Sequence, residues 1–181
     1  DHPQSGMIPR SVYNIFQILE EGKFDEYSVR VSHMEFYNEE IIDLLGSSQS
    51  KPLRLFEHPK EGVTVHNLER VPVSSADAIF KILRKSTQKR LTCETNLNAT
   101  SSRSHCIFSI SVRTKQSANN GEEVIRSGTL HLVDLAGSEG VGKSGDINRR
   151  ETGLINQSLL TLGRVIKAVA VNQSHVPYRE S

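Results

Sequence analysis

The sequence predicts an α/β fold, and three observations support this prediction. Segments whose apolar residues follow a helical period alternate along the 181-residue chain with short segments rich in β-branched residues. Turn-forming residues separate these segments, and none of the separating stretches has the composition of a linker between domains. The chain also has no internal repeat. We therefore expect a single α/β unit.

The first part of the chain is predicted to form a helix followed by short strands. Apolar residues recur at the helical period in Ile8–Glu21, and Pro9 stands near the start, where a helix tolerates proline. The stretch GSSQSKP is predicted to be a loop. Strand-like segments lie at Tyr27–Phe36, Leu53–Phe56 and Val63–His66.

The middle of the chain is predicted to contain a second helix and a hairpin. Ser74 and Asp77 form a helix-start signature before the helical segment Ala78–Arg90. Two strands follow, separated by polar residues that end in Asn119, Asn120 and Gly121, a sequence typical of hairpin turns. These strands are Cys106–Arg113 and Glu123–Val133.

A last helix is predicted at Ile155–Val171, because its apolar residues recur at spacings of four and three. We expect this apolar stripe to pack on the core, and it consists of Ile155, Leu159, Leu162, Ile166 and Val169. The opposite face holds Asn156, Gln157, Arg164 and Lys167. Leu154 and Leu160 are assigned to neither face.

Composition excludes several classes of protein. No apolar run reaches the roughly 18 residues typical of a membrane span. Cys93 and Cys106 have no CxxC spacing and no accompanying histidine cluster, so neither a zinc site nor a disulfide framework is indicated, and a reducing cytosol fits best. The net charge is +1.

The segment LVDLAGSE, Leu132–Glu139, has the pattern of a nucleotide sensor. Asp134 is predicted to leave the carboxyl end of a strand, where a carboxylate can hold Mg²⁺ through water. Gly137 has no side chain, so its backbone N–H can approach a γ-phosphate that is present in a triphosphate and absent from a diphosphate. The alternative is an ordinary strand end followed by a tight turn.

Gly137–Ser144 also matches GxxxxGKS, the phosphate-binding P-loop pattern. A P-loop needs a helix that starts at the Lys-Ser pair, and the composition of Gly145–Asn148 predicts a loop instead. The only apolar strand that ends in Asp is already part of the sensor. We therefore interpret this stretch as a flexible loop that follows the sensor.

A second polar segment, NATSSRSH at Asn98–His105, supplies many hydroxyl and amide groups that can bind Mg²⁺ and position water. Arg103 carries a planar cation suited to a carboxylate, and Glu139 is its candidate partner if the two segments face one another. The alternative is a solvated loop before a strand.

Together, NATSSRSH and LVDLAGSE resemble switch I and switch II of the kinesin motor domain. VSHMEFYNEEIIDLL, INQSLLTLGRVI and HVPYRES resemble further kinesin signatures and occur in the family's order. GMIPR, YNEEIIDLL, NQSLLTLGRVI and HVPYRES are most similar to the bipolar mitotic (BimC-type) subfamily. The resemblance implies part of the kinesin-type P-loop NTPase fold, an α/β fold with a mostly β central sheet flanked by helices. It implies that residues 1–181 are incomplete at both ends, starting after the P-loop and ending before the final helices and neck linker.

The resemblance also implies a function, namely a microtubule-dependent motor ATPase that uses ATP and Mg²⁺. In the full protein we expect a plus-end-directed spindle motor of the cytoplasm and cytoskeleton, with a coiled coil and homo-oligomerisation through regions outside this chain. Neither nucleic acid nor membrane is expected as a partner. By itself the chain is expected to be inactive, because the P-loop is absent from it.

Site residues are carried over from the resemblance position by position. Nucleotide binding is assigned to Asn98, Ser101, Ser102, Asp134 and Gly137, with Ser102 and Asp134 on the metal, the latter through water. Catalytic roles are assigned to Ser102, Arg103, Gly137 and Glu139. Microtubule contacts are assigned to Lys60, Lys143, Arg150, Asn156, Arg164, Lys167, His175, Tyr178 and Arg179.

Two other functions stay open. The chain is basic from Lys143 to Ser181, which favours an acidic polymer and suits a non-catalytic tubulin-binding module, although the charge alone favours the ordinary explanation, scattered surface charge. Aromatic residues for base stacking do not accompany these charges, which argues against RNA. The DxxG pattern suggests a GTPase-like switch, but there is no NKxD to read guanine, and Ser138 stands where a water-positioning Gln is expected.

Overall fold

A computed structural model describes residues 6–47, 52–58, 62–94, 103–118, 122–138 and 146–180, with the backbone alone for 91–94 and 146–152. Helices and strands alternate along the chain as predicted. In chain order they are α1 (Met7–Glu21), β1 (Glu26–Tyr37), β2 (Glu40–Asp43), β3 (Arg54–His58), β4 (Gly62–His66), β5 (Val71–Val73), α2 (Ala76–Glu94), β6 (His105–Ser117), β7 (Glu123–Asp134) and α3 (Asp146–Ala170).

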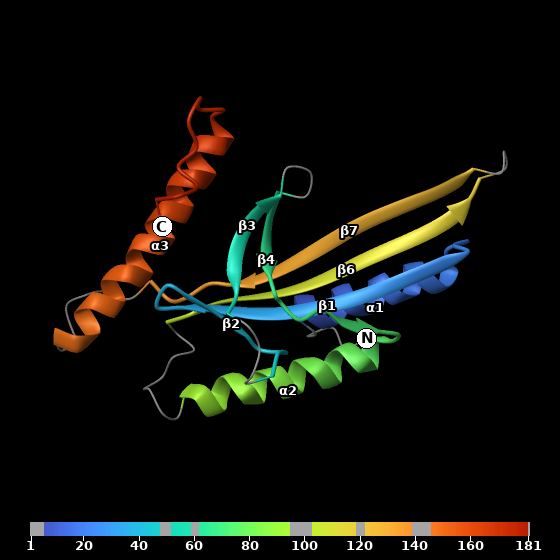
Figure 1. Ribbon diagram of the computed structural model, residues 1–181, viewed down its shortest axis with the longest axis horizontal. Helices are drawn as coiled ribbons and strands as arrows, with labels where there is room; N and C mark the ends of the chain where they lie inside the picture. The colour runs from blue at the N-terminus through green and yellow to red at the C-terminus, as the bar shows by residue number, and fades with distance from the viewer. Residues whose placement is uncertain are drawn as a thin grey trace.

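The main sheet is antiparallel and has five strands (Figure 1). Its strand order is β2-β1-β6-β7, and β5 also pairs with β1. The long strands β6 and β7 form the predicted hairpin, from Cys106 opposite Asp134 to Ser117 opposite Glu123. β3 and β4 form a separate two-stranded hairpin that stands away from the main sheet. This topology brings the start of β6 and the end of β7 side by side.

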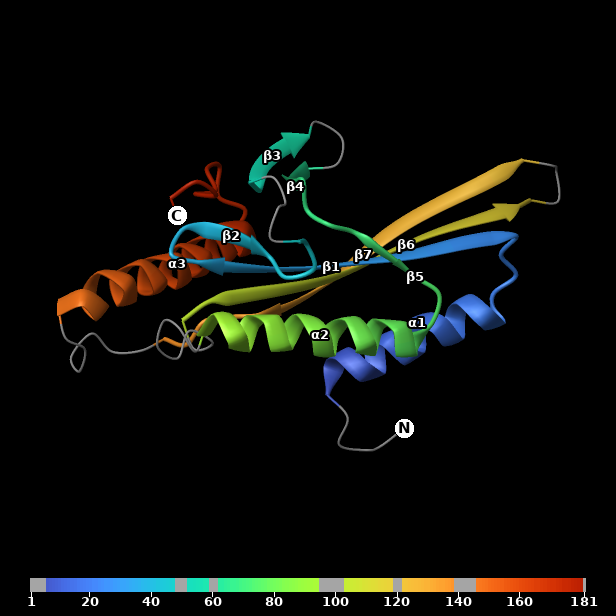
Figure 2. The same ribbon diagram turned by 60° about the horizontal axis from the view of Figure 1, so that its bottom comes forward.

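The hydrophobic core lies between one face of the sheet and the helices α1 and α2, which lie on the same side of it (Figure 2). Side chains alternate between the two faces of a strand, so every second residue of β1 and β6 reaches this core. Each fully buried side chain of this size stabilises the fold by about 1.5–3 kcal/mol. The buried cluster consists of Val12, Phe16, Leu19, Val29, Val31, Ile79, Phe108 and Ile110.

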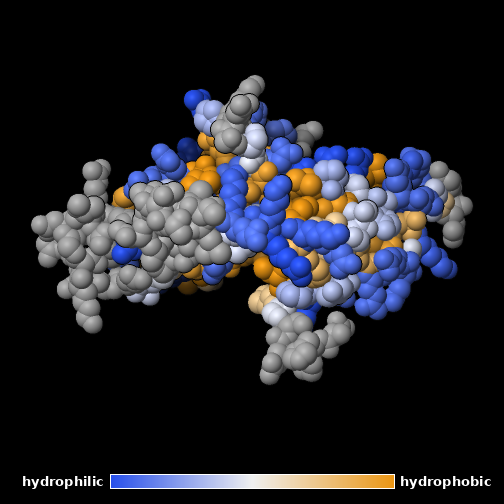
Figure 3. Space-filling view, turned by 90° about the horizontal axis from the view of Figure 1, so that it is seen from below, coloured by the Kyte–Doolittle hydropathy of each residue, from blue (hydrophilic) through white to orange (hydrophobic). Residues whose placement is uncertain are grey.

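The outer surface of α2 is polar, as expected for an amphipathic helix, whereas α1 also exposes Met7, Tyr13 and Ile18. Seen from below Figure 1, hydrophilic residues run across the middle of the molecule with hydrophobic residues beside them (Figure 3). On α2 the exposed residues include Lys81, Arg84 and Lys85. The predicted helices at Ile8–Glu21 and Ala78–Arg90 are thus confirmed within a few residues at each end.

Two short strands were not predicted, and local chemistry explains why. Asn38 and Glu39 both have positive φ, 49° and 65°, in the two-residue turn that joins β1 to β2. Such turns favour Asn-Gly, so Asn-Glu gave no hairpin signal. β2 ends at Asp43, whose carboxylate accepts hydrogen bonds from the backbone N–H groups of Leu45 (2.8 Å) and Glu69 (2.8 Å). The other missed strand, β5, has only three residues.

The predicted start of α3 was wrong. The composition of 145–148 indicated a loop, but the helix begins at Asp146, nine residues before the predicted Ile155. A carboxylate in the first turn is favourable beside the positive end of the helix dipole, which offsets the low helix propensity of Asp and Asn. The composition of 145–148 therefore no longer counts against the P-loop pattern, although residues 139–144 of that pattern lie outside the described part of the chain.

The predicted buried stripe of α3 was also wrong by one residue. Leu162, Ile166 and Val169 are 38%, 59% and 51% exposed, whereas Thr161 and Ala168 are 6% and 2% exposed. The buried side continues through half-buried residues at the same three- and four-residue spacing, namely Leu154, Ser158 and Val165. Two neighbouring stripes of α3 both carry apolar residues, and the stripe with the smaller side chains is the one that is buried.

Candidate functional site

The structure brings parts of both predicted sensor segments to one end of the sheet. Asp134 is the last residue of β7 and lies opposite Cys106 of β6. Arg103 and Ser104 directly precede β6, and Gly137 follows three residues after Asp134. Antiparallel pairing therefore places the end of NATSSRSH next to LVDLAGSE, as the sequence required for a shared site.

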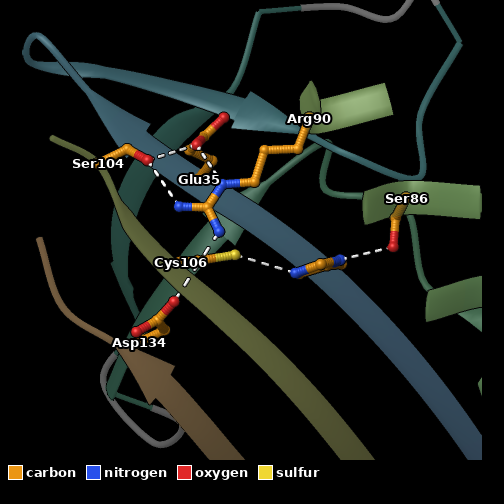
Figure 4. A network of polar contacts seen from close by, with 7 residues as sticks. Glu35, Ser86, Arg90, Ser104, Cys106 and Asp134 are labelled. Carbon is orange, nitrogen blue, oxygen red and sulfur yellow. Dashed lines mark hydrogen bonds and ion pairs between the residues drawn. The ribbon is translucent and has the colours of Figure 1, made fainter. Parts of the chain in front are cut away.

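A buried ion pair links this region to α2 (Figure 4). Arg90 donates from Nε to Oε1 of Glu35 at 2.9 Å, and the two side chains are 14% and 5% exposed. Ser104 joins the pair, since its hydroxyl accepts from Nη2 of Arg90 at 3.0 Å and donates to Glu35. Nη1 of Arg90 lies 3.9 Å from Oδ2 of Asp134. Arg90 therefore contacts β1, the segment before β6 and the end of β7.

A second polar chain runs beside this ion pair and is also buried. Ser86 donates its proton to the carbonyl of Leu83 (3.0 Å), so its oxygen accepts from Nδ1 of His33 at 2.8 Å. Nε2 of His33 then accepts from the thiol of Cys106 at 3.0 Å. Burial lowers the pKa of His33 to about 4 and raises the pKa of the Cys106 thiol to about 11. Both groups are therefore neutral, and every proton has an acceptor.

His105 joins three separate segments through its two ring nitrogens. The backbone N–H of Ala136 donates to Nδ1 at 3.1 Å, and Nε2 lies 2.8 Å from the hydroxyl of Ser158 on α3. Burial lowers the pKa of His105, which favours the neutral ring that this arrangement needs. Ala136 is 6% exposed, and a buried N–H left without its acceptor costs about 1–3 kcal/mol.

An apolar pocket of about 510 Å³ lies beside His105, between the sheet, β3 and α3. Its walls include Phe36, Ile107 and Val133 from the sheet face opposite the core, together with Leu154 and Ile155 of α3; Arg103 lines it as well. Ser158 also borders this pocket. The hydrogen bonds of His105 therefore lie against apolar surroundings, where electrostatic interactions are stronger than in water.

Asp134 has the properties expected of a ligand that holds Mg²⁺ through water. Its side chain is 78% exposed at the end of β7, and Mg²⁺ prefers carboxylate oxygens while retaining much of its water shell. Among the described residues, no group of three or more His, Cys, Asp or Glu forms a ready metal centre. The metal role of Asp134 stays a prediction.

Several predicted site residues lie outside the described part of the chain. They are Lys60, Asn98, Ser101, Ser102, Glu139 and Lys143. The predicted ion pair between Arg103 and Glu139 therefore stays a prediction. Arg150 lies within α3, where the backbone alone is described.

The remaining basic residues predicted to contact a partner gather near the end of α3. Arg164, Lys167 and His175 line one shallow hollow together with Glu180. Arg164 pairs with Glu180 at 3.2 Å, and Arg179 pairs with Glu57 of β3 at 2.8 Å. Tyr178 is 70% exposed, whereas Asn156 is half-buried. Sequence-distant segments thus share one surface.

Sequence reasoning missed the roles of Arg90, Glu35, His33 and His105. Each lies in an element predicted for its apolar pattern or in a motif cited for other residues. The available signal was a charged or polar residue at a core-facing strand position, as at His33 and Glu35 in β1, which are 5% and 4% exposed. Such residues are rarely buried without a partner.

The whole chain matches a known family of proteins. The family model described as the kinesin motor domain covers residues 1–181. The chain belongs to the kinesin motor-domain family. A solved structure of a fast kinesin, described with its implications for ATPase mechanism and interactions with microtubules, superposes with a TM-score of 0.83. That structure is 43% identical, and the match covers 100% of this chain and 51% of that one.

Curated relatives support the predicted subfamily. Kinesin-like protein KIN-5A of Arabidopsis thaliana is 51% identical over 98% of this chain, and kinesin-like protein KIF11 of Mus musculus is 47% identical over 100% of it. The match spans 18% of the length of each relative. The predicted similarity to the bipolar mitotic kinesins and the predicted kinesin fold are confirmed. No helix in the described ranges is long and apolar enough to cross a membrane.

Proposed function

We propose that this kinesin chain belongs to a microtubule-dependent motor ATPase that acts on the mitotic spindle and moves toward microtubule plus ends. Membership of the kinesin motor-domain family supports a role on microtubules. The similarity to KIN-5A and KIF11 supports the bipolar mitotic type. The similar fast kinesin is described by its ATPase mechanism and its interactions with microtubules, which supports the same reaction class.

The proposed mechanism rests on one observation, the hydrogen-bonded connection between the loop after β7 and α3. The loop that contains Gly137 begins at the end of β7, where Asp134 lies near Arg90. Farther along this loop, Ala136 is hydrogen-bonded to His105, and His105 is hydrogen-bonded to Ser158 of α3. A change at the nucleotide can therefore reach α3 through contacts that already exist. We assign NATSSRSH and LVDLAGSE as switch I and switch II and α3 as the helix that faces the microtubule.

Individual residues would then have separate tasks in ATP hydrolysis. Bound Mg²⁺ would neutralise phosphate charge, with Asp134 holding it through water and Ser102 contacting it directly. Asn98 and Ser101 would position the phosphates and the attacking water. The N–H of Gly137 would detect the γ-phosphate, and an ion pair between Arg103 and Glu139 would close the site.

The proposal is tested by ATP turnover of the full protein with and without microtubules. Gly137→Ala places a methyl group where the N–H must approach phosphate, so microtubule-stimulated turnover should fall about 100-fold. Gly128→Ala is the matched control, because a Cβ added at Gly128 of β7 meets nothing within 4 Å. Equal turnover in the two variants would contradict the sensor role, and a wild-type protein without microtubule-stimulated turnover would contradict the proposed function.

Direction and location are tested separately. Gliding on polarity-marked microtubules should show movement toward plus ends, and the tagged full protein should accumulate on the spindle of dividing cells. Movement toward minus ends, or a label absent from the spindle, would contradict the bipolar mitotic assignment.

The basic surface near the end of α3 favours one second candidate, a tubulin-binding module without catalysis. Lys167 and Arg179 are exposed, and a cationic surface attracts an acidic lattice. This candidate predicts salt-sensitive sedimentation with microtubules that is the same with ATP, with ADP and without nucleotide. Nucleotide-dependent sedimentation would exclude it.

A further inference from the structure

We propose that His105 is a positioning residue that couples the loop after β7 to α3, so that the state of this loop determines the position of the helix. This inference rests on the proposed function and names the side chain that carries the signal within it. His105 is the first residue of β6, Ala136 lies just beyond β7, and Ser158 lies within α3. One ring therefore joins three elements that are distant in the sequence.

The proton arrangement at His105 is determined by its neighbours. Ser158 donates its hydroxyl proton to the carbonyl of Ile155 at 2.7 Å, so its oxygen is left to accept from Nε2–H of His105 at 2.8 Å. Nδ1 then carries the lone pair that accepts the Ala136 N–H at 3.1 Å. Both polar edges of the ring are used, and each bond requires the tautomer that the other one selects.

The buried, apolar surroundings of His105 favour positions of the loop and the helix in which both of its hydrogen bonds are made. Ala136 is buried, and both His105 and Ser158 border the apolar pocket between the sheet and α3. When a hydrogen bond breaks against apolar walls, water does not replace it as readily as at an open surface. The loop and the helix consequently favour positions in which both bonds are made.

The coupling follows from the chain's connectivity. Gly137 directly follows Ala136, so movement of the Gly137 N–H toward a phosphate also moves the Ala136 N–H. Either His105 follows and carries Ser158 with it, or the bond to Nδ1 breaks. In the first case α3 moves together with the loop, and in the second the loop loses its bond to α3, so the nucleotide state of the loop biases the helix between two positions.

Replacements of His105 can separate its two bonds. The side-chain amide of Asn lies near the place of Nδ1, so His105→Asn can keep the acceptor for Ala136 and lose the donor to Ser158. The longer Gln places its amide near Nε2, so His105→Gln can keep the donor to Ser158 and lose the acceptor. His105→Ala loses both bonds, and Ser158→Ala removes the α3 partner alone.

The test measures ATP turnover of the full protein without microtubules and across a range of microtubule concentrations. We expect Ser158→Ala to keep the basal turnover. Ser158→Ala and His105→Asn should each lower the microtubule-stimulated kcat, relative to that variant's own basal turnover, about threefold to tenfold, the effect of one hydrogen bond. Adding Ser158→Ala to His105→Asn should have no further effect. Normal microtubule stimulation in both single variants, or additive effects in the double variant, would overturn the proposal.

A second measurement does not depend on motor activity. Hydrogen exchange at the amide of Ala136 should accelerate about threefold to tenfold in His105→Gln and stay near the wild-type rate in His105→Asn. Equal exchange in the two variants would overturn the coupling. A wild-type protein whose turnover ignores microtubules would instead contradict the proposed function, and the exchange experiment would still decide whether His105 holds the loop.

Discussion

Arg90 of α2 and Glu35 of β1 form a buried ion pair, with Nε and Oε1 separated by 2.9 Å. Ser104 supplies a further hydrogen bond to each partner, so the charges are well satisfied. Removing one member of such a pair leaves the other charge buried and uncompensated, which is far more costly than losing an exposed pair. Arg90 also reaches Asp134, so the same pair supports the predicted nucleotide end of the sheet.

We predict that Arg90→Ala lowers the free energy of unfolding by about 3–5 kcal/mol, because Glu35 then stays buried without its cation. Lys115→Ala is the control, since it removes an exposed pair with Glu123, and it should lower the free energy of unfolding much less than Arg90→Ala does. Urea denaturation measures both values. Similar losses in the two variants would show that the buried pair contributes no more than a surface pair.

We predict that His33 makes the fold less stable in weak acid. Its pKa falls from 6.5 to about 4 on folding, so between these values the unfolded chain binds a proton that the folded chain does not. Stability is therefore retained above pH 6.5 and declines below it by up to about 1.4 kcal/mol per pH unit. His33→Leu should remove this part of the slope in urea denaturation measured from pH 7 to pH 4.

The control for this prediction is His66→Gln, which removes an exposed imidazole and leaves the bonds of His33 to Ser86 and Cys106 intact. Subtracting each variant's profile from the wild-type profile isolates the contribution of the replaced histidine. An unchanged slope in His33→Leu would mean that His33 takes up its proton in the folded state as easily as in the unfolded one.

Periodicity predicted the elements that bury a continuous apolar face and failed where burial depends on a partner. α1 was predicted because Val12, Phe16 and Leu19 repeat at helical spacing, and these residues form part of the core. In α3, two neighbouring stripes carry apolar residues, and only the contacts of Ser158 and Thr161 show which one faces inward. Sequence alone has no information on that choice.

The residues of the candidate site likewise fall into those that a local motif predicts and those that only the folded structure brings together. Asp134, Gly137 and Arg103 were predicted because their motifs are contiguous in the sequence, and the structure places them at one end of the sheet. Arg90 and Glu35 lie 55 positions apart, and their pairing depends on how α2 packs on β1. Strand register and helix packing create such contacts, so no local pattern could reveal them.

We predict opposite effects of alanine at two glycines. Gly62 has a φ of +73°, a conformation that costs a residue with a Cβ about 1–2 kcal/mol, so Gly62→Ala should weaken the β3–β4 hairpin. Gly163 lies within α3 and a Cβ there meets nothing within 4 Å, so Gly163→Ala should stabilise the helix by up to about 1 kcal/mol. Hydrogen exchange in each element measures the change. Faster exchange in α3 of Gly163→Ala would contradict the prediction.

The last prediction concerns Glu57 and Arg179. Arg179 is assigned to microtubule binding, and in this structure it is paired with Glu57. Nη2 of Arg179 lies 2.8 Å from Oε2 of Glu57, and the two side chains are 89% and 67% exposed. An exposed pair contributes at most about 1 kcal/mol, so an acidic lattice can compete for Arg179 at little cost. Arg179→Ala should weaken microtubule binding about threefold to tenfold, whereas Glu57→Gln should strengthen it by removing the competing carboxylate.

Sedimentation with microtubules at low and high salt measures both changes, which should shrink together as salt screens the charges. Arg126→Ala is the control, since Arg126 is an exposed cation near the other end of β7, opposite Thr114. Weaker binding after Glu57→Gln would show that the carboxylate holds Arg179 in its binding position instead of competing for it. The sign of this single change thus distinguishes a competing partner from a positioning one.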